Sequence, residues 1–202
     1  MGNFISDLKN SFNRGNISLQ FIYINVGVFV VTTLISVFLM LFNWDATSWW
    51  EYLELPAWMP LFLSQPWSLV TYMFLHAGVL HLLFNMLWLY WFGQLFLSLY
   101  SARHFRGLYI LGGLCGGMLY MLAYNVFPYF SNYLIGSFLL GASASVLAIV
   151  VATAVRSPEY RVNFMLIGAV RLKYVALFVV LTDLLFVTSG NGGGHIAHLG
   201  GA

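Results

Sequence analysis

Residues 136–155 read GSFLLGASASVLAIVVATAV, an apolar stretch without a charged side chain. About 20 apolar residues are enough for a helix to cross the hydrocarbon core of a bilayer. The whole chain has the same character, because its 202 residues are 61% hydrophobic and 7% charged. A soluble domain carries roughly 45–50% apolar and about 25% charged residues. The sequence therefore predicts an all-α membrane protein.

Further apolar stretches predict the other spans of a helical bundle. We expect helices over residues 19–42, 79–100, 107–127 and 174–187, and a sixth helix that begins near His195. As a helix, residues 195–202 reach only about 13 Å, which is too short to cross. We therefore expect a six-helix transmembrane bundle whose last helix is truncated at Ala202 and is completed in a longer natural chain.

Two segments outside these spans have their own composition. Residues 1–18 are polar and of mixed charge, which fits neither a cleavable signal peptide nor a span, so we expect a cytosolic N-terminal tail. Residues 45–65 combine tryptophan, proline and acidic residues, as is typical of a segment at the headgroup level. The sequence thus predicts a transmembrane domain over residues 19–202 that contains an interfacial loop at 45–65.

The basic residues set the expected orientation. All eight Lys and Arg residues precede the first span or lie between the second and third or the fourth and fifth spans. Because basic loops stay on the cytosolic side, the N-terminus is expected in the cytoplasm and the interfacial loop outside. The expected setting is a bacterial inner membrane. A net charge of +2 is too small to indicate nucleic acid as a partner, which leaves the lipid bilayer and other membrane proteins.

Four polar side chains are expected at one depth near the outer surface. Ser143 precedes Arg156 by 13 residues, which places it about 20 Å above the inner boundary. His198 follows the glycine-rich outer loop by one turn, and His81 and Asn85 lie one turn apart on the second span. Polar groups are costly inside a membrane and therefore indicate function.

These four residues have the chemistry needed for acyl transfer. Ser143 would attack a carbonyl carbon while neutral His198 takes the hydroxyl proton and later returns it to the leaving amine. Asn85, His81 and the backbone N–H of Ser143 are candidate donors to the oxyanion. The helix dipole would add to this if the helix begins at Ser143.

Three motifs together resemble the rhomboid intramembrane serine proteases. They are HAGVLHLLFN at residues 76–85, GASA at 141–144 and AHLGG at 197–201. The resemblance extends from about Gln65 to the end of the chain. It implies a six-helix bundle, a Ser143–His198 dyad without a third acid, and oxyanion donors from His81, Asn85 and the Ser143 amide. It also implies hydrolysis, without a cofactor, of a peptide bond in or beside a transmembrane segment of a single-span membrane protein.

Two positions depart from the family pattern. Ala144 stands where the family often has glycine, and Leu147 stands where it often has an aromatic ring packed against the catalytic histidine. Neither change removes a reacting atom, so we expect an effect on rate rather than on reaction type. A catalytically silent rhomboid-like protein that binds transmembrane segments is the alternative, and a small transporter is a third reading.

Other polar residues in the spans are interpreted as structural. Ser145, His76 and His195 are expected to pack or to lie at the interface, and Cys115 is expected to pack within its span. No metal is expected, because neither an H-E-x-x-H pair nor a carboxylate ligand accompanies the histidines.

Asp183 is an acid within the fifth span, about 15 Å from its inner boundary. It would either orient His198 as the acid of a triad does, or be protonated or hydrogen-bonded within the bundle. The difference in estimated depth favours the second interpretation.

Overall fold

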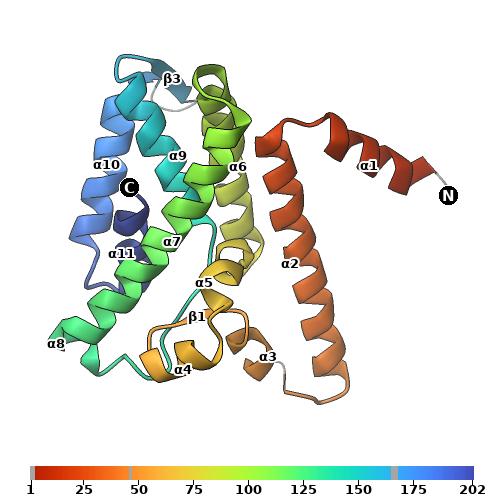
Figure 1. Cartoon of the computed structure of the whole chain (residues 1–202), viewed down its shortest axis with the longest axis vertical. Coiled ribbons are helices and arrows are strands. Elements are labelled where there is room, and N and C mark those ends of the chain that lie inside the picture. The colour runs from red at the N-terminus through yellow and green to blue at the C-terminus, as the bar shows by residue number, and fades with distance from the viewer. Residues whose placement is uncertain (1–2, 46, 165–167) are drawn as a thin grey trace.

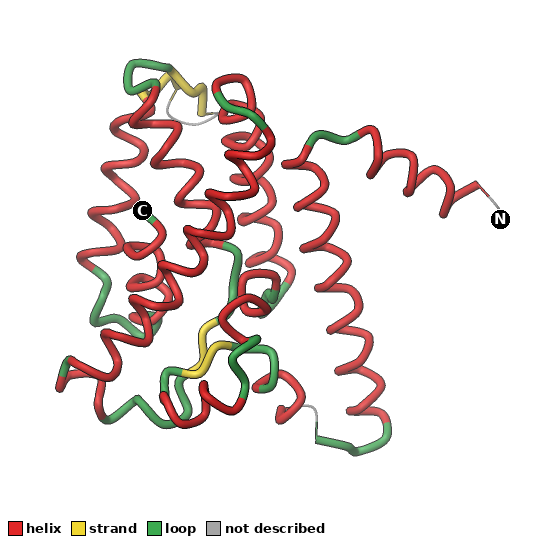
Figure 2. Tube along the Cα trace, in the orientation of Figure 1, coloured by secondary structure: helices red, strands yellow, loops and turns green. Residues whose placement is uncertain are grey.

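The computed structural model describes residues 3–45, 47–164 and 168–202, and most of them are helical (Figures 1 and 2). Three of the described helices are long and apolar enough to cross a membrane: α2 (Ile17–Leu41), α6 (Val79–Leu99) and α7 (Ala102–Val126). The helix α9 (Ser143–Arg156) is apolar but shorter. The sequence predicts an all-α membrane protein; the structure is mostly helical, but it also has four short strands among the described residues.

The other helices are short or lie at the ends of the bundle. They are α1 (Asn3–Arg14), α3 (Thr47–Glu51), α4 (Met59–Ser64), α5 (Ser68–Thr71), the 3-10 helix η1 (Tyr72–Phe74), α8 (Pro128–Ser131), α10 (Leu172–Leu185) and α11 (Gly192–Gly201). Two antiparallel strand pairs join β1 (Leu55–Pro56) to β2 (Phe138–Leu139) and β3 (Arg161–Phe164) to β4 (Gly168–Arg171).

The helix expected as the fourth span starts later than the sequence predicts. The prediction placed its start at Gly136, whereas α9 begins at Ser143. Gly136 and Gly141 both have positive φ angles, of 88° and 131°, which interrupt a helix. Between them β2 pairs with β1, with Leu139 opposite Leu55. Within this stretch, residues 138–139 therefore form a strand that leads toward the helix.

The third membrane helix starts earlier than predicted. The sequence placed Arg103 and Arg106 in a loop before residue 107, but α7 begins at Ala102 and includes both. Long basic side chains can reach the headgroup region from the first turns of a membrane helix, so these charges do not prevent the helix from including them. Cys115 is also exposed on α7 rather than packed within the bundle, because it lies on an outward-facing side of the helix.

Helix α7 is the central packing element of the bundle. Figure 1 shows α7 crossing beside α9 and α11, and contacts join it to both helices. A Cβ atom at Gly112 would lie 2.4 Å from Cβ of Ala148 in α9. A Cβ atom at Gly116 would lie 2.6 Å from the carbonyl oxygen of Ala197 in α11. These glycines allow the backbones of the three helices to approach closely, as small residues do in membrane bundles.

Helix α2 stands partly apart from the other helices (Figure 1). The Ser18 hydroxyl in its first turn donates to the Leu89 carbonyl at 2.9 Å. Asn25 Nδ2 donates to the Tyr109 hydroxyl at 3.2 Å. Beyond these contacts α2 exposes large apolar side chains, including Leu34, which is 63% exposed. Such a surface suits lipid contact rather than water.

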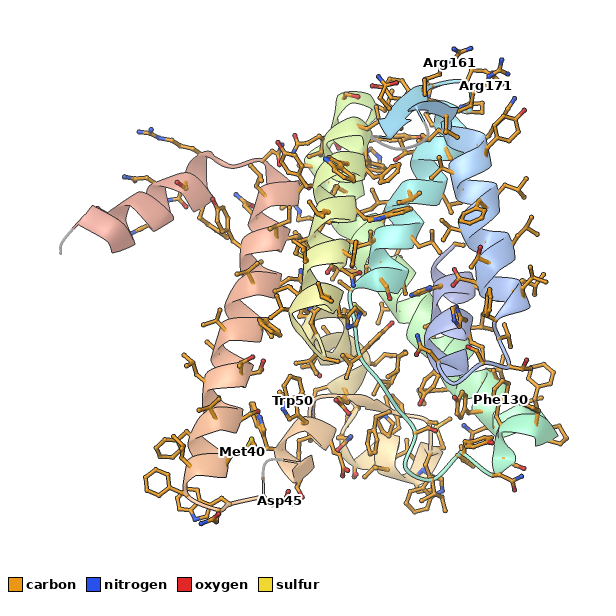
Figure 3. The ribbon with its side chains drawn as sticks, turned by 180° about the vertical axis from the view of Figure 1, so that it is seen from behind. Met40, Asp45, Trp50, Phe130, Arg161 and Arg171 are labelled. Atoms are coloured by element: carbon orange, nitrogen blue, oxygen red, sulfur yellow. The ribbon has the colours of Figure 1, made fainter. Side chains whose placement is uncertain are left out.

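Charged residues are separated between the two ends of the bundle. Figure 3 shows Arg161 and Arg171 at one end and Asp45 and Trp50 at the other. At the basic end, Glu159 accepts from Arg171 at 2.8 Å and also pairs with Lys173. The segment 45–65, predicted to be interfacial, folds as α3, β1 and α4 at the opposite end.

Candidate active site

A cavity of about 700 Å³ opens among α6, α7, α11 and the segment that leads into α9. Its wall includes all four polar side chains that the sequence placed at one depth, namely His81, Asn85, Ser143 and His198. Residues from the segments 136–140 and 190–194 also line it. The structure therefore brings the predicted site residues of three helices to one cavity.

Ser143 is the first residue of α9, and Ala142 is its N-cap. The first N–H groups of a helix have no partner within the helix, and the helix dipole favours negative charge at this end. The helix begins at Ser143, which is the condition for the expected contribution of the helix dipole. A negative oxygen beside the Ser143 amide would meet the positive end of α9.

Gly141 brings His81 next to the backbone that precedes Ser143. Its φ of 131° lies in the region that side chains other than glycine rarely adopt. Its N–H donates to the Tyr72 carbonyl oxygen at 2.9 Å. A Cβ atom at this position would lie 3.0 Å from both Cε1 and Nε2 of His81, and 3.6 Å from Oγ of Ser143. The His81 ring therefore lies directly against this backbone.

The hydrogen bonds of α6 leave donors free to face the cavity. The Ala77 N–H donates to Nδ1 of His81 at 3.4 Å. A ring nitrogen that accepts carries no proton, so Nε2 of neutral His81 is the protonated nitrogen. Asn85 Nδ2 donates to the His81 carbonyl oxygen at 2.9 Å, which uses one of its two N–H groups. His81 and Asn85 can each donate to an oxygen in the cavity.

His198 is held from behind by Asp183. Its Nδ1 lies 2.8 Å from Oδ1 of Asp183 on α10. The same oxygen lies 2.8 Å from Nδ1 of His195, one turn earlier on α11. Asp183 is 3% exposed, whereas the two histidine side chains are 20% and 24% exposed. The carboxylate is therefore buried behind the imidazole rings.

Ser143 and His198 also line a second, narrower cavity of about 190 Å³. Phe84 and Trp88 of α6 and Val179 of α10 contribute to its wall. Within the part of the chain that the structure describes, no hydrogen bond joins Oγ of Ser143 to His198. In unliganded enzymes, catalytic hydrogen bonds are often long and shorten only when substrate binds.

The reach of Asp183 corrects two inferences from the sequence. The estimated depth of Asp183 favoured a role other than orienting His198, because helix heights were compared without the lengths of the side chains. The histidines were also expected to lack a carboxylate neighbour, yet the ligand atoms of Asp183, His195 and His198 lie within 4.8 Å of one another. This set has the donor types of a metal site, although each Nδ1 already has the carboxylate as a partner. The sequence feature that indicates this contact is an acid in an apolar span together with two histidines at i and i+3.

The residues interpreted as structural lie beside the cavity rather than on its wall. Ser145 is 1% exposed and points toward α7, where a Cβ atom at Gly113 would lie 2.7 Å from its Oγ. His76 is 1% exposed and meets the His81 ring edge-on, at 5.0 Å between centroids.

The structure accommodates Ala144 and Leu147, the two departures from the family pattern. Cβ of Ala144 would lie 2.7 Å from a Cβ atom at Gly116, so the glycine on α7 makes room for the alanine. A Cβ atom at Gly201 would lie 2.3 Å from the Ala144 carbonyl oxygen, which fixes α11 closely against α9. Leu147 is 5% exposed and lines the narrower cavity with His198.

These features define an integral membrane protein in which a serine at a helix N-terminus and histidines from two other helices surround a polar cavity. The family model described as Rhomboid domain matches residues 63–202, which include all four predicted site residues. The chain belongs to the rhomboid family.

A curated relative with sequence similarity is the RHOMBOID-like protein 12, mitochondrial, of Arabidopsis thaliana. The two sequences are 28% identical over 144 residues, which cover 67% of this chain and 43% of the relative. The chain thus spans less than half of the relative's length.

Proposed function

We propose that this protein is an intramembrane serine endopeptidase that hydrolyses peptide bonds in or beside transmembrane segments of single-span membrane proteins. The observation that carries this proposal is the convergence of Ser143, at the start of α9, and His198 on the wall of one cavity that also presents two side-chain donors. The assignment uses no cofactor, because a hydroxyl, an imidazole and oxyanion donors are sufficient for acyl transfer.

The reaction follows from the roles of these atoms. Oγ of Ser143 attacks the carbonyl carbon while Nε2 of His198 takes the hydroxyl proton. The Oγ to Nε2 hydrogen bond forms when a bound substrate brings the two side chains together. His81 Nε2, Asn85 Nδ2 and the Ser143 N–H donate to the oxyanion. The histidine then protonates the leaving amine, and water activated by the same ring hydrolyses the acyl-enzyme.

The narrower cavity supplies a route for the substrate between α6 and α10. Its apolar wall of Phe84, Trp88 and Val179 suits the side chains of a transmembrane segment. A helical peptide bond is shielded by its own turns, so the segment must unwind before Ser143 can attack. Segments with glycine, proline or other weak helix formers are therefore the preferred substrates.

The proposed arrangement in the membrane has six helices, with α9, α10 and α11 added to the three long ones. The fourteen residues of α9 span about 21 Å. The strand β2 and the residues that follow it complete that crossing at the outer end. In the proposed setting, the inner membrane of a bacterial cell, the positive-inside rule puts the basic end in the cytoplasm and the cavity at the outer face.

Cleavage of a model single-span protein tests this proposal. The purified native chain should cut the substrate in or beside its transmembrane segment, with the site located by mass spectrometry. Ser143→Ala should abolish the cut, whereas Ser145→Ala is a matched control that removes a buried hydroxyl two residues away and should retain it. A native chain that binds the substrate and leaves it intact would instead indicate a catalytically silent rhomboid-like protein.

A further inference from the structure

We propose that Asp183 is a positioning residue that holds His198 as a neutral base, with His195 as the counter-charge of the carboxylate. This inference rests on the proposed function, because it assigns the residues that prepare the base of the same reaction. It adds a third and a fourth residue to the Ser143–His198 pair.

The geometry places one oxygen between two imidazole rings. Oδ1 of Asp183 lies 2.8 Å from Nδ1 of His198 and 2.8 Å from Nδ1 of His195. An ionised carboxylate only accepts hydrogen bonds, so each Nδ1 bears a proton. In neutral His198 the remaining nitrogen, Nε2, is then the acceptor, as a base for Ser143 requires.

Charge balance assigns different states to the two histidines. A buried ionised carboxylate is costly unless it is paired, and Asp183 is 3% exposed. One imidazolium neutralises it, and a second proton would leave an excess positive charge. We assign the imidazolium to His195, because protonated His198 could not take a proton from Ser143. The cluster therefore contains one carboxylate, one cationic ring and one neutral ring.

The structure also explains why His198 needs this support. Leu147 packs beside it in the narrower cavity but offers no hydrogen bond to orient a ring. The α11 backbone is held by close contacts at Gly200 and Gly201, where an added Cβ would lie 2.8 Å from Gly116 Cα and 2.3 Å from the Ala144 oxygen. Backbone packing fixes the position of the His198 backbone, and Asp183 fixes the orientation of its ring.

Asp183→Asn tests the positioning role with little change in volume. We expect turnover to fall by about 10²–10⁴-fold, as when the acid of a serine protease triad becomes an amide and the wrong histidine tautomer is held. KM should change by less than about twofold, because the side chain does not line either cavity. Thr182→Val is the matched control, since among the described residues the adjacent Thr182 hydroxyl bonds only the Phe178 carbonyl of its own helix. This variant should keep the native rate.

Nitrogen NMR of labelled histidine gives a readout that does not depend on turnover. His198 of the native chain should be neutral and protonated at Nδ1, and Asp183→Asn should shift it toward the Nε2–H tautomer. His195→Asn should leave the Nδ1–H tautomer of His198 in place, because His198 keeps its own bond to Asp183.

Three results would overturn this inference. Asp183→Asn with turnover within about twofold of the native chain would remove the positioning role. A native His198 protonated at Nε2 alone would exclude the proposed hydrogen bond. Native activity that is lost in a chelator and restored by Zn²⁺ would assign the three ligands to a metal. If the native chain cuts nothing, the proposed function fails, while the NMR tautomer still decides the Asp183–His198 bond.

Discussion

At the scale of single residues, Gly141 shapes the site through both its backbone conformation and its lack of a side chain. Its positive φ turns the chain into α9, and its missing side chain makes room for His81. Gly141→Ala should destabilise the fold by about 1–3 kcal/mol, because the backbone is strained for alanine. It should also slow cleavage, because the new Cβ atom would lie 3.0 Å from His81 Nε2 and displace an oxyanion donor.

Gly107→Ala is the matched control for this prediction. Gly107 lies in α7, and an added Cβ atom there meets no other atom within 4 Å. Thermal unfolding and cleavage kinetics of both variants provide the comparison. Equal stability and equal rates for Gly141→Ala and the native chain would contradict the role given to Gly141.

Single residues also show where sequence reasoning succeeds and where it stops. Ser143, His198, His81 and Asn85 could be placed together because their depths follow from helix rise and from the charged ends of the spans. The contact between Asp183 and His198 could not be obtained in this way. It depends on the rotation of two helices about their axes and on side-chain direction, which a depth estimate does not contain.

At the scale of elements, the segment before α9 decides where the nucleophile lies. The sequence 136–155 is uniformly apolar, so hydropathy predicts one helix throughout. The pairing of β2 with β1 overrides this, because Leu139 bonds to a strand that lies far away in the sequence at Leu55. Such a long-range pairing has no local sequence signal. The result is that Ser143 lies at the N-terminus of a helix rather than in its middle.

The segment 45–65, predicted to be interfacial, contains a carboxyl group whose pKa is shifted. Burial and the neighbouring Glu51 raise the pKa of Glu54 to about 7. Because the folded state favours the protonated form, its contribution to stability is full below the ordinary pKa of 4.5 and is lost as pH rises through about 7. Glu54→Gln should therefore reduce the loss of thermal stability between about pH 5 and about pH 8.

Glu159→Gln is the control for this pH dependence. A hydrogen bond from Lys173 lowers the pKa of Glu159, so this group titrates below the tested interval. Its stability contribution is present above the ordinary pKa and is lost as pH falls. The pH dependence of the melting temperature should therefore differ between the two variants. An unchanged pH dependence in Glu54→Gln would contradict the effect assigned to Glu54.

At the scale of the whole molecule, the account requires the cavity to open on the side opposite the basic loops. Single cysteines test this in a background in which the exposed Cys115 is replaced by serine. A cysteine at Glu51 should react with a membrane-impermeant thiol reagent added outside intact cells. A cysteine at Ser101, between α6 and α7, should react only after the membrane is opened. The reverse pattern would contradict the orientation.

The most direct measurement for the central claim is the mapping of a fluorophosphonate adduct by mass spectrometry. The account predicts that the native chain is phosphonylated on Ser143 and that His198→Ala blocks the modification, since the hydroxyl then lacks its base. Modification of another serine, or equal modification of Ser143 in His198→Ala, would contradict it.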